Sequence, residues 1–208
     1  MSGYSIRVAS AIVASWALHA RVHDVRPDAV WLRWHAGRPD TAYLSPVPAW
    51  CLESDDAAIA AGAAPTGEGE LLDALIATLL DQHLLPVAEA LRTHGRVSKR
   101  SLHGAIASPL GNAFAWLDRL RAAPTEHIAQ RASHFFDACG GRLGSSGRMI
   151  EGALGEHRQL FWCRDTCCLA YLRPDVGYCG TCNLLPWDER VAAWERTLQQ
   201  TVANLQPG

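Results

Sequence analysis

Apolar side chains recur at helical spacing along most of the chain. A first stripe lies within residues 5–22 and predicts a helix that ends near His23 and Asp24. A longer stripe covers residues 71–91 and includes His83 on its apolar side. Pro86 lacks a backbone N–H, so this second helix is expected to bend there.

Three further segments have the same periodicity. Residues 98–120 predict one helix, or two helices broken at Pro109. Residues 125–139 predict an amphipathic helix with Thr125 as its N-cap, and residues 188–202 predict a closing helix. Amphipathic helices in this number are expected to pack as a bundle.

Strand character is concentrated after the first predicted helix. Residues 29–35 and 41–44 are rich in β-branched and aromatic side chains, and the turn-forming residues 37–40 separate them. This pattern predicts a β-hairpin. Residues 55–68 are rich in Ala, Gly, Asp and Pro, which predicts a linker with one helical turn at residues 57–61. The expected fold is mainly α within the α+β class: a helical bundle, a small β-hairpin and a C-terminal cysteine-rich loop.

Composition places the chain among globular proteins. It has 208 residues, 49% of them hydrophobic, and a formal net charge of -2, which argues against disorder and against bulk attraction to nucleic acid. No run of 18 apolar residues occurs, so we expect neither a spanning helix nor a signal peptide. A cytoplasmic location follows as an expectation. In that reducing compartment seven cysteines favour metal or redox chemistry over disulfides.

Four of the cysteines form two pairs near the C-terminus. Cys167 and Cys168 are adjacent, and Cys179 and Cys182 follow after ten residues in a CxxC pair. Four thiolates suit either tetrahedral zinc or an iron–sulfur cluster. Zinc sites usually use two CxxC or CxxxC pairs, whereas only one pair here has that spacing. A two-iron cluster shares adjacent cysteines over a larger core, so the spacing favours iron–sulfur while zinc stays open.

The cysteine segment resembles a known signature. The stretch from Arg164 to Tyr171, followed by Pro174 and by residues 178–182, is similar to the C-terminal CC-x10-CxxC motif of the FhuF-type ferric siderophore reductases. The likeness covers residues 161–186, with a weaker likeness over residues 101–112. It departs at Asn183, where proline is common, and at His103, where tryptophan is common.

This resemblance implies an oxidoreductase that acts on metal ions in iron acquisition. Cys167, Cys168, Cys179 and Cys182 would bind a [2Fe–2S] cluster that reduces siderophore-bound iron(III) by one electron. The implied partners are a ferric siderophore of hydroxamate type and an external electron donor such as a ferredoxin or flavin reductase. No nucleic acid is expected, and at most a peripheral membrane association. We expect a siderophore-reductase-like domain at residues 1–160 and a cluster-binding segment with the closing helix at residues 161–208, together forming one compact unit.

Side chains near the cysteines are candidates for substrate contact or for tuning the reduction potential. They are Arg164, Tyr171, Arg173, Tyr178 and Trp187. For Arg164 we favour tuning, because a nearby cation stabilises the more negative, reduced state of a thiolate cluster. Two alternatives to the reductase stay open: a structural four-cysteine zinc module that binds protein or nucleic acid, and an electron-transfer protein for another acceptor.

The remaining candidates have ordinary structural interpretations. Free cysteines are commonly buried, so Cys51, Cys139 and Cys163 are expected to pack rather than to bind metal. His83 is expected in the core. Packing is also expected of the tryptophans at helical spacing and in the hairpin, namely Trp16, Trp116, Trp194, Trp31 and Trp34. The basic run of Arg92, Arg96, Lys99 and Arg100 is expected to be solvated.

Overall fold

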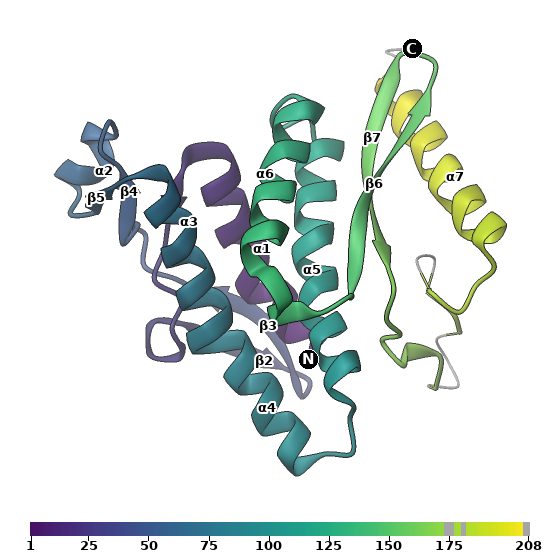
Figure 1. Ribbon diagram of the computed structural model, residues 1–208, viewed down its shortest axis with the longest axis horizontal. Coiled ribbons are helices and arrows are strands. Elements are labelled where there is room, and N and C mark those ends of the chain that lie inside the picture. Colours follow the sequence, from purple (N-terminus) through teal and green to yellow (C-terminus); the bar gives the residue numbers. More distant parts are fainter. Residues whose placement is uncertain (173–176, 180–181, 206–208) are drawn as a thin grey trace.

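The computed structural model describes residues 1–172, 177–179 and 182–205. It is mainly helical with small sheets, as expected from the sequence (Figure 1). The α-helices are α1 (Ser2–His19), α2 (Asp56–Ala60), α3 (Glu68–Ile76), α4 (Leu85–His94), α5 (Lys99–Arg119), α6 (Thr125–Cys139) and α7 (Trp187–Leu205). The strands are β1 (Arg21–Val22), β2 (Trp31–His35), β3 (Arg38–Tyr43), β4 (Trp50–Leu52), β5 (Ala64–Thr66), β6 (Gly147–Leu154) and β7 (His157–Arg164).

The main core lies where α1, α3, α5 and α6 meet. Trp16, Phe114 and Phe135 are fully buried there, with ring centroids 5.8 to 6.4 Å apart. Burial of side chains this large stabilises the fold by about 1.5–3 kcal/mol each. Trp116 was expected to pack as well, and that prediction is wrong: it is 41% exposed on the outer side of α5.

The first helix ends earlier than the stripe predicted. Ala20 adopts a left-handed conformation (φ 49°) directly after His19, and its N–H donates to the carbonyls of Ser15 and Trp16. The chain then enters β1, which pairs with β4 in a sheet of order β1-β4-β5. The expected end near His23 is therefore wrong, because the αL residue terminates the helix before the apolar pattern stops.

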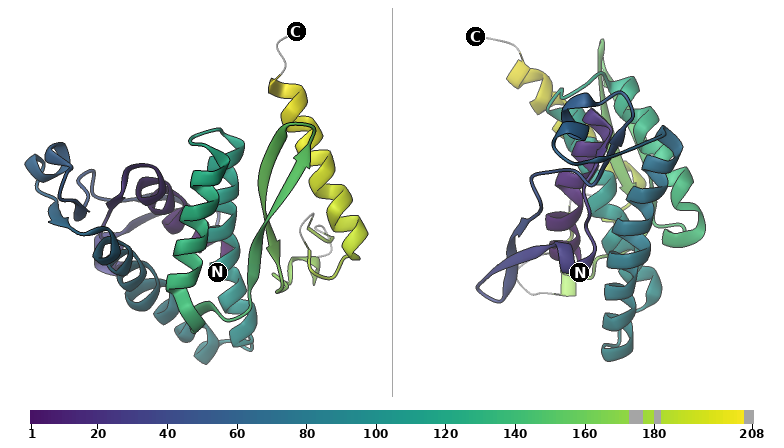
Figure 2. Two further views of the ribbon diagram at one scale, coloured as in Figure 1. Left: turned by 45° about the horizontal axis from the view of Figure 1, so that its top comes forward. Right: turned by 90° about the vertical axis from the view of Figure 1, so that its left-hand side faces the viewer.

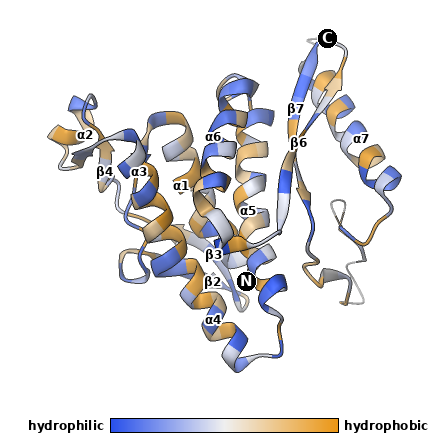
Figure 3. Ribbon diagram, viewed as in Figure 1, coloured by the Kyte–Doolittle hydropathy of each residue, from blue (hydrophilic) through white to orange (hydrophobic). Residues whose placement is uncertain are grey.

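The second apolar stripe forms one rod, which runs from α3 through a π-helical segment, Ala77–Leu84, into α4 (Figure 3). At the end of the π segment the Leu85 N–H donates to the Leu80 carbonyl, an i→i−5 bond, one residue before Pro86. The wider π turn accommodates the proline ring, which would collide with the i−4 carbonyl of an α-helix. By length and composition alone this rod, Glu68–His94, could cross a membrane, but half of its most apolar window is buried inside the protein.

The predicted N-terminal hairpin is confirmed as β2 and β3. Ala36 and Gly37, both with positive φ, form its two-residue turn. Trp31 and Trp34 are nevertheless 63% and 60% exposed, so the prediction that they pack is wrong. The hairpin contacts the bundle through β3 and α1, which leaves β2 facing solvent.

α5 is continuous through Pro109, so the single helix is found, which is one of the two forms expected for residues 98–120. One detail of α6 differs from expectation. The N-cap of α6 is Pro124, not Thr125. The Thr125 hydroxyl instead donates to the Asp118 carboxylate at 2.6 Å, and the other oxygen of that carboxylate accepts the Leu160 N–H at 2.7 Å. Asp118 thereby ties α6 and β7 to α5.

A second hairpin, β6–β7, was not predicted and positions the cysteine segment. It lies between the bundle and α7, with β7 against α5 and β6 against α7 (Figures 1 and 2). On the α7 side a small separate core contains Phe161, Cys163, Trp194 and Leu198. The two-part division expected from the sequence lies between residues 160 and 161, and this boundary falls inside β7. The division stays a prediction.

Candidate metal centre

The four paired cysteines lie in the connection between β7 and α7 (Figure 1). Two residues separate the end of β7 from Cys167 and Cys168, and a 3-10 turn, Ala170–Leu172, comes next. Gly177, two residues before Cys179, adopts a positive φ of 59°. Arg173 and Pro174, both named above from the sequence, lie outside the described residues.

The thiols of Cys168 and Cys182 lie near enough to Cys179 to affect the pKa of its thiol. The pKa of the Cys179 thiol is raised, first by burial and then by the nearby thiols of Cys168 and Cys182, while Arg164 acts in the opposite direction. Cys182 is buried, and its N–H donates to the Cys179 carbonyl at 2.8 Å. The Cys167 sulfur accepts the Leu169 N–H at 3.3 Å. The structure therefore groups Cys168, Cys179 and Cys182, with Cys167 beside Cys168 in sequence.

The donor set fits a two-iron cluster. Within the described ranges, no three His, Cys, Asp or Glu side chains are placed to hold one metal ion. A [2Fe–2S] core takes four cysteines, two on each iron. Two pairs of thiols on one short connection supply that arrangement.

Arg164 is buried directly behind the second cysteine pair. Its exposed fraction is 6%; Nε donates to the Thr166 carbonyl at 2.8 Å, and Nη1 lies 3.8 Å from the Cys179 sulfur. Its third nitrogen, Nη2, is buried without a hydrogen-bond partner. An unpartnered guanidinium N–H beside thiols suits an anionic group in this space, and the tuning role expected of Arg164 stays a prediction.

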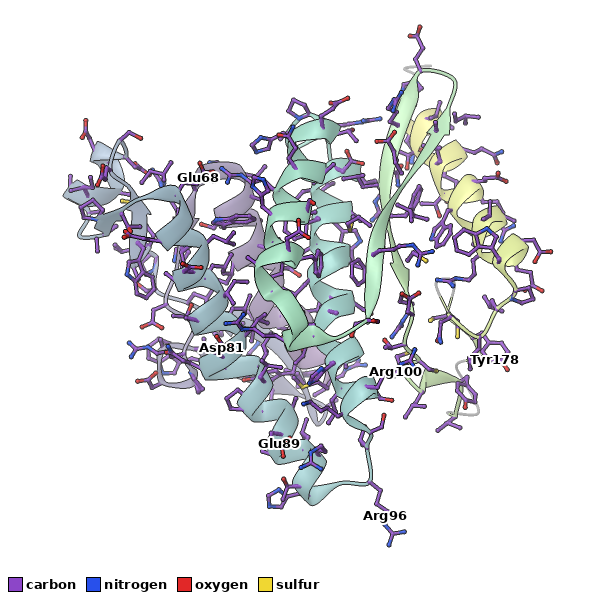
Figure 4. All side chains as sticks on the ribbon, in the orientation of Figure 1. Glu68, Asp81, Glu89, Arg96, Arg100 and Tyr178 are labelled. Atoms are coloured by element: carbon purple, nitrogen blue, oxygen red, sulfur yellow. The ribbon has the colours of Figure 1, made fainter. Side chains whose placement is uncertain are left out.

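The two candidate tyrosines lie on the outside of the segment. Tyr171 and Tyr178 are 38% and 57% exposed, and their ring centroids are 5.6 Å apart (Figure 4). Trp187 begins α7, is half exposed, and has the Arg190 guanidinium 5.6 Å from its ring centroid. These rings form part of the outer surface around the cysteines, as a docking role requires.

Comparison with protein families gives one match for this part of the chain. Residues 164–182 match the family model described as FhuF 2Fe-2S C-terminal domain. The segment is of the FhuF type. The resemblance read from the sequence is thus confirmed for these residues, and it points to iron–sulfur electron transfer. The chain matches none of the curated proteins.

Glycines on α5 allow the FhuF-type segment to lie close to the bundle. A Cβ at Gly104 would lie 1.8 Å from Oγ1 of Thr166, and one at Gly111 would lie 2.1 Å from Cε3 of Trp162. The two positions are seven residues apart, so they share one helix face. The small-residue stretch noted in the sequence therefore has a structural role: it seats β7 and the residue before the first cysteine.

Arg190 was missed by the sequence reasoning. It is 7% exposed, and its Nη2 donates to the Cys163 sulfur at 3.1 Å and to the Arg164 carbonyl at 2.9 Å. Its guanidinium also lies 5.4 Å from the Trp194 ring centroid. The only sequence signal is its spacing from Trp187 and Trp194, three residues after one and four before the other on one face of α7.

The other cysteines and the basic run behave largely as expected. Cys51, Cys139 and Cys163 are buried away from solvent. Burial raises the pKa of the Cys139 thiol to about 12. In the basic run Arg92 pairs with Glu89, whereas the Arg100 guanidinium donates to the Asp165 carbonyl at 3.1 Å, so α5 is linked to the FhuF-type segment (Figure 4).

A hollow of about 390 Å³ opens beside the first cysteine pair. One wall is Cys167, Cys168 and Leu169, and the opposite walls are the end of α4 and the start of α5. Leu91, Val97 and Leu102 make much of its lining apolar. Its volume lies within the range of small-molecule sites, about 300–1,000 Å³.

Proposed function

We propose that the protein is a ferric-siderophore reductase that transfers one electron from a [2Fe–2S] cluster to iron(III) in a siderophore complex. The observation that carries the proposal is the match of residues 164–182 to the FhuF 2Fe-2S C-terminal domain, with both cysteine pairs present. Cys167, Cys168, Cys179 and Cys182 are the proposed ligands. When bound, such a cluster supplies reversible one-electron transfer at a potential set by its surroundings.

The chain's own residues would contribute binding and charge. The hollow beside Cys167 and Cys168 would hold the ferric complex, which brings its iron next to the first pair of ligands. Siderophores hold iron(III) through hard oxygen ligands, and iron(II) is bound less strongly, so one electron is enough to loosen the complex. The apolar lining suits the methylene chains of a hydroxamate siderophore.

The electron donor would be another protein. No dinucleotide-binding fingerprint follows a strand in this sequence, so a ferredoxin or flavin reductase is the proposed source. The exposed rings of Tyr171 and Tyr178 provide a surface for such a contact. We propose a cytoplasmic site of action, where iron(II) is released.

The first experiment is an anaerobic absorption spectrum with iron, sulfide and zinc analysis, followed by addition of a ferric hydroxamate to the dithionite-reduced protein. The proposal predicts two irons and two sulfides per chain, and reoxidation of the cluster while a chelator traps iron(II). A colourless protein with one zinc ion would contradict it and support the zinc module. A cluster that ferric hydroxamate does not reoxidise would indicate a different electron acceptor.

A further inference from the structure

Two arginines are buried behind the cysteine segment without an acidic partner among the described residues. Arg164 and Arg190 are 6% and 7% exposed, and neither takes part in the ion pairs found there. Asp165, the neighbouring acid, pairs weakly with Arg148 at 3.6 Å and is itself partly exposed. Within the described residues, both buried guanidinium groups donate to neutral carbonyls and to sulfur.

Each of these cations also has an unsatisfied nitrogen. Arg164 Nη2 and Arg190 Nε are buried and have no hydrogen-bond partner within the described part of the chain. A buried charge destabilises a protein unless an opposite charge compensates it, and an unpaired buried donor adds to that cost. Among the described residues, the proposed ligand that can compensate is Cys179, whose sulfur lies 3.8 Å from Arg164 Nη1. Arg190 Nη2 lies 3.1 Å from the sulfur of Cys163, which is not a proposed ligand, so Arg190 faces the ligands only through Arg164.

We infer that Arg164 is the counter-charge of the metal-bound thiolates and that Arg190 holds it in place and adds a second, more distant cation, a role that rests on the proposed function for the identity of the metal group. Four thiolates around an oxidised [2Fe–2S] core leave a net charge of about -2, which the Arg164 guanidinium partly offsets from beside Cys179. Arg164 faces the Cys179 ligand. Arg190 is a positioning residue, because its Nη2 donates to the Arg164 carbonyl at 2.9 Å. Its own guanidinium therefore lies against the Arg164 backbone, further from the ligand Cys179 than the Arg164 guanidinium.

This arrangement affects the redox chemistry. Reduction by an electron from the external donor takes the cluster charge from about -2 to about -3, so fixed cations favour the reduced form. Removing the Arg164 charge should lower the ratio of reduced to oxidised protein at a given potential by about tenfold, which is ~59 mV for a one-electron couple. The arginines would thus make the cluster easier to reduce.

The test compares Arg164→Gln, Arg190→Gln, Arg164→Lys and a control, Arg196→Gln. Arg196 is exposed on the same helix as Arg190. Redox titration followed by electron paramagnetic resonance gives the potential. Arg164→Gln should show the tenfold loss. Arg190→Gln should show a smaller loss because its charge is more distant, Arg164→Lys a smaller loss because it keeps the charge, and Arg196→Gln none. If the Gln variants carry the cluster and have the same reduction potential as the wild-type protein, the inference is overturned.

A second measurement covers variants that bind little cluster or metal. The thermal unfolding of each variant is compared between protein without its metal group and protein with it, whether that group is a cluster or a metal ion. A counter-charge predicts that Arg164→Gln stabilises the metal-free form, where the cation is uncompensated, relative to wild type. A packing role predicts that it destabilises both forms, which would overturn the inference. If wild-type protein binds one zinc ion, the proposed function fails while this comparison still tests the counter-charge, since a zinc ion with four thiolates has the same net charge.

Discussion

Replacing Gly104 by alanine tests how the bundle positions the first cysteine pair. The new Cβ would lie 1.8 Å from Thr166 Oγ1 and 2.5 Å from Thr166 Cβ. Rotation of the threonine side chain moves its oxygen but not its Cβ. To restore a contact of about 3.5 Å, the backbone at Thr166 must move by about 1 Å. Cys167 is the next residue, so the displacement reaches the proposed ligands directly.

The magnitude follows from two opposing effects. An alanine inside a helix gains about 1 kcal/mol over glycine, whereas overpacking of this kind costs about 1–3 kcal/mol. Gly69→Ala in α3 is the matched control, because nothing lies within 4 Å of its added Cβ. The difference between the two variants isolates the overlap, about 1–3 kcal/mol. At about 2–4 °C per kcal/mol for a chain of this size, Gly104→Ala should melt about 2–12 °C below Gly69→Ala.

The assay is thermal unfolding together with the iron and sulfide content of the purified protein. We expect reduced cluster content in Gly104→Ala and wild-type content in Gly69→Ala. A second substitution locates the cause: Thr166→Gly removes the colliding Cβ and should restore loading, whereas Thr166→Ala keeps it and should not. Wild-type loading in Gly104→Ala, with a melting temperature equal to that of Gly69→Ala, would refute the reasoning.

Three further predictions concern cysteines and a histidine. Cys179→Ser should abolish or severely disturb the visible spectrum, whereas Cys51→Ser, in a separate small core, should leave it nearly unchanged; equal spectra would contradict the ligand assignment. In native protein at pH 8, Cys139 should resist iodoacetamide, as peptide mass mapping can show, because burial raises the pKa of its thiol to about 12. Burial lowers the pKa of His83 below its usual 6.5, so the unfolded state binds more protons and the free energy of unfolding should fall as pH drops below about 6.5. Urea titrations at pH 7.5 and 5.5 measure that slope, which should be shallower in His83→Gln.

Most helices and the cysteine motif could be predicted because their signals are local. Apolar periodicity marks α5 and α6, and the spacing of four cysteines marks the metal segment without any knowledge of the fold. The β6–β7 hairpin could not be found in this way. Its second strand is buried continuously from Gln159 to Arg164 between α5 and α7, so it lacks the alternation of a strand with one solvent face.

Other features depend on contacts between distant parts of the chain. Trp31 and Trp34 have the composition of a packed strand, but exposure depends on which face of the hairpin the bundle covers. Arg190 looks like an ordinary surface position of an amphipathic helix. Only its contacts with Cys163 and with the carbonyl of Arg164 show that it is buried beside the metal segment.

The division of the apolar interior into a large bundle core and a small core under α7 has a consequence for access to the metal segment. Among the described elements, the principal contacts of α7 are with β6 and β7, so this helix depends on the hairpin rather than on the bundle. A region with few buried contacts opens locally at a lower free-energy cost than the whole fold. The small core under α7 can therefore open while the bundle core stays folded, which gives access to the metal segment without unfolding the whole protein.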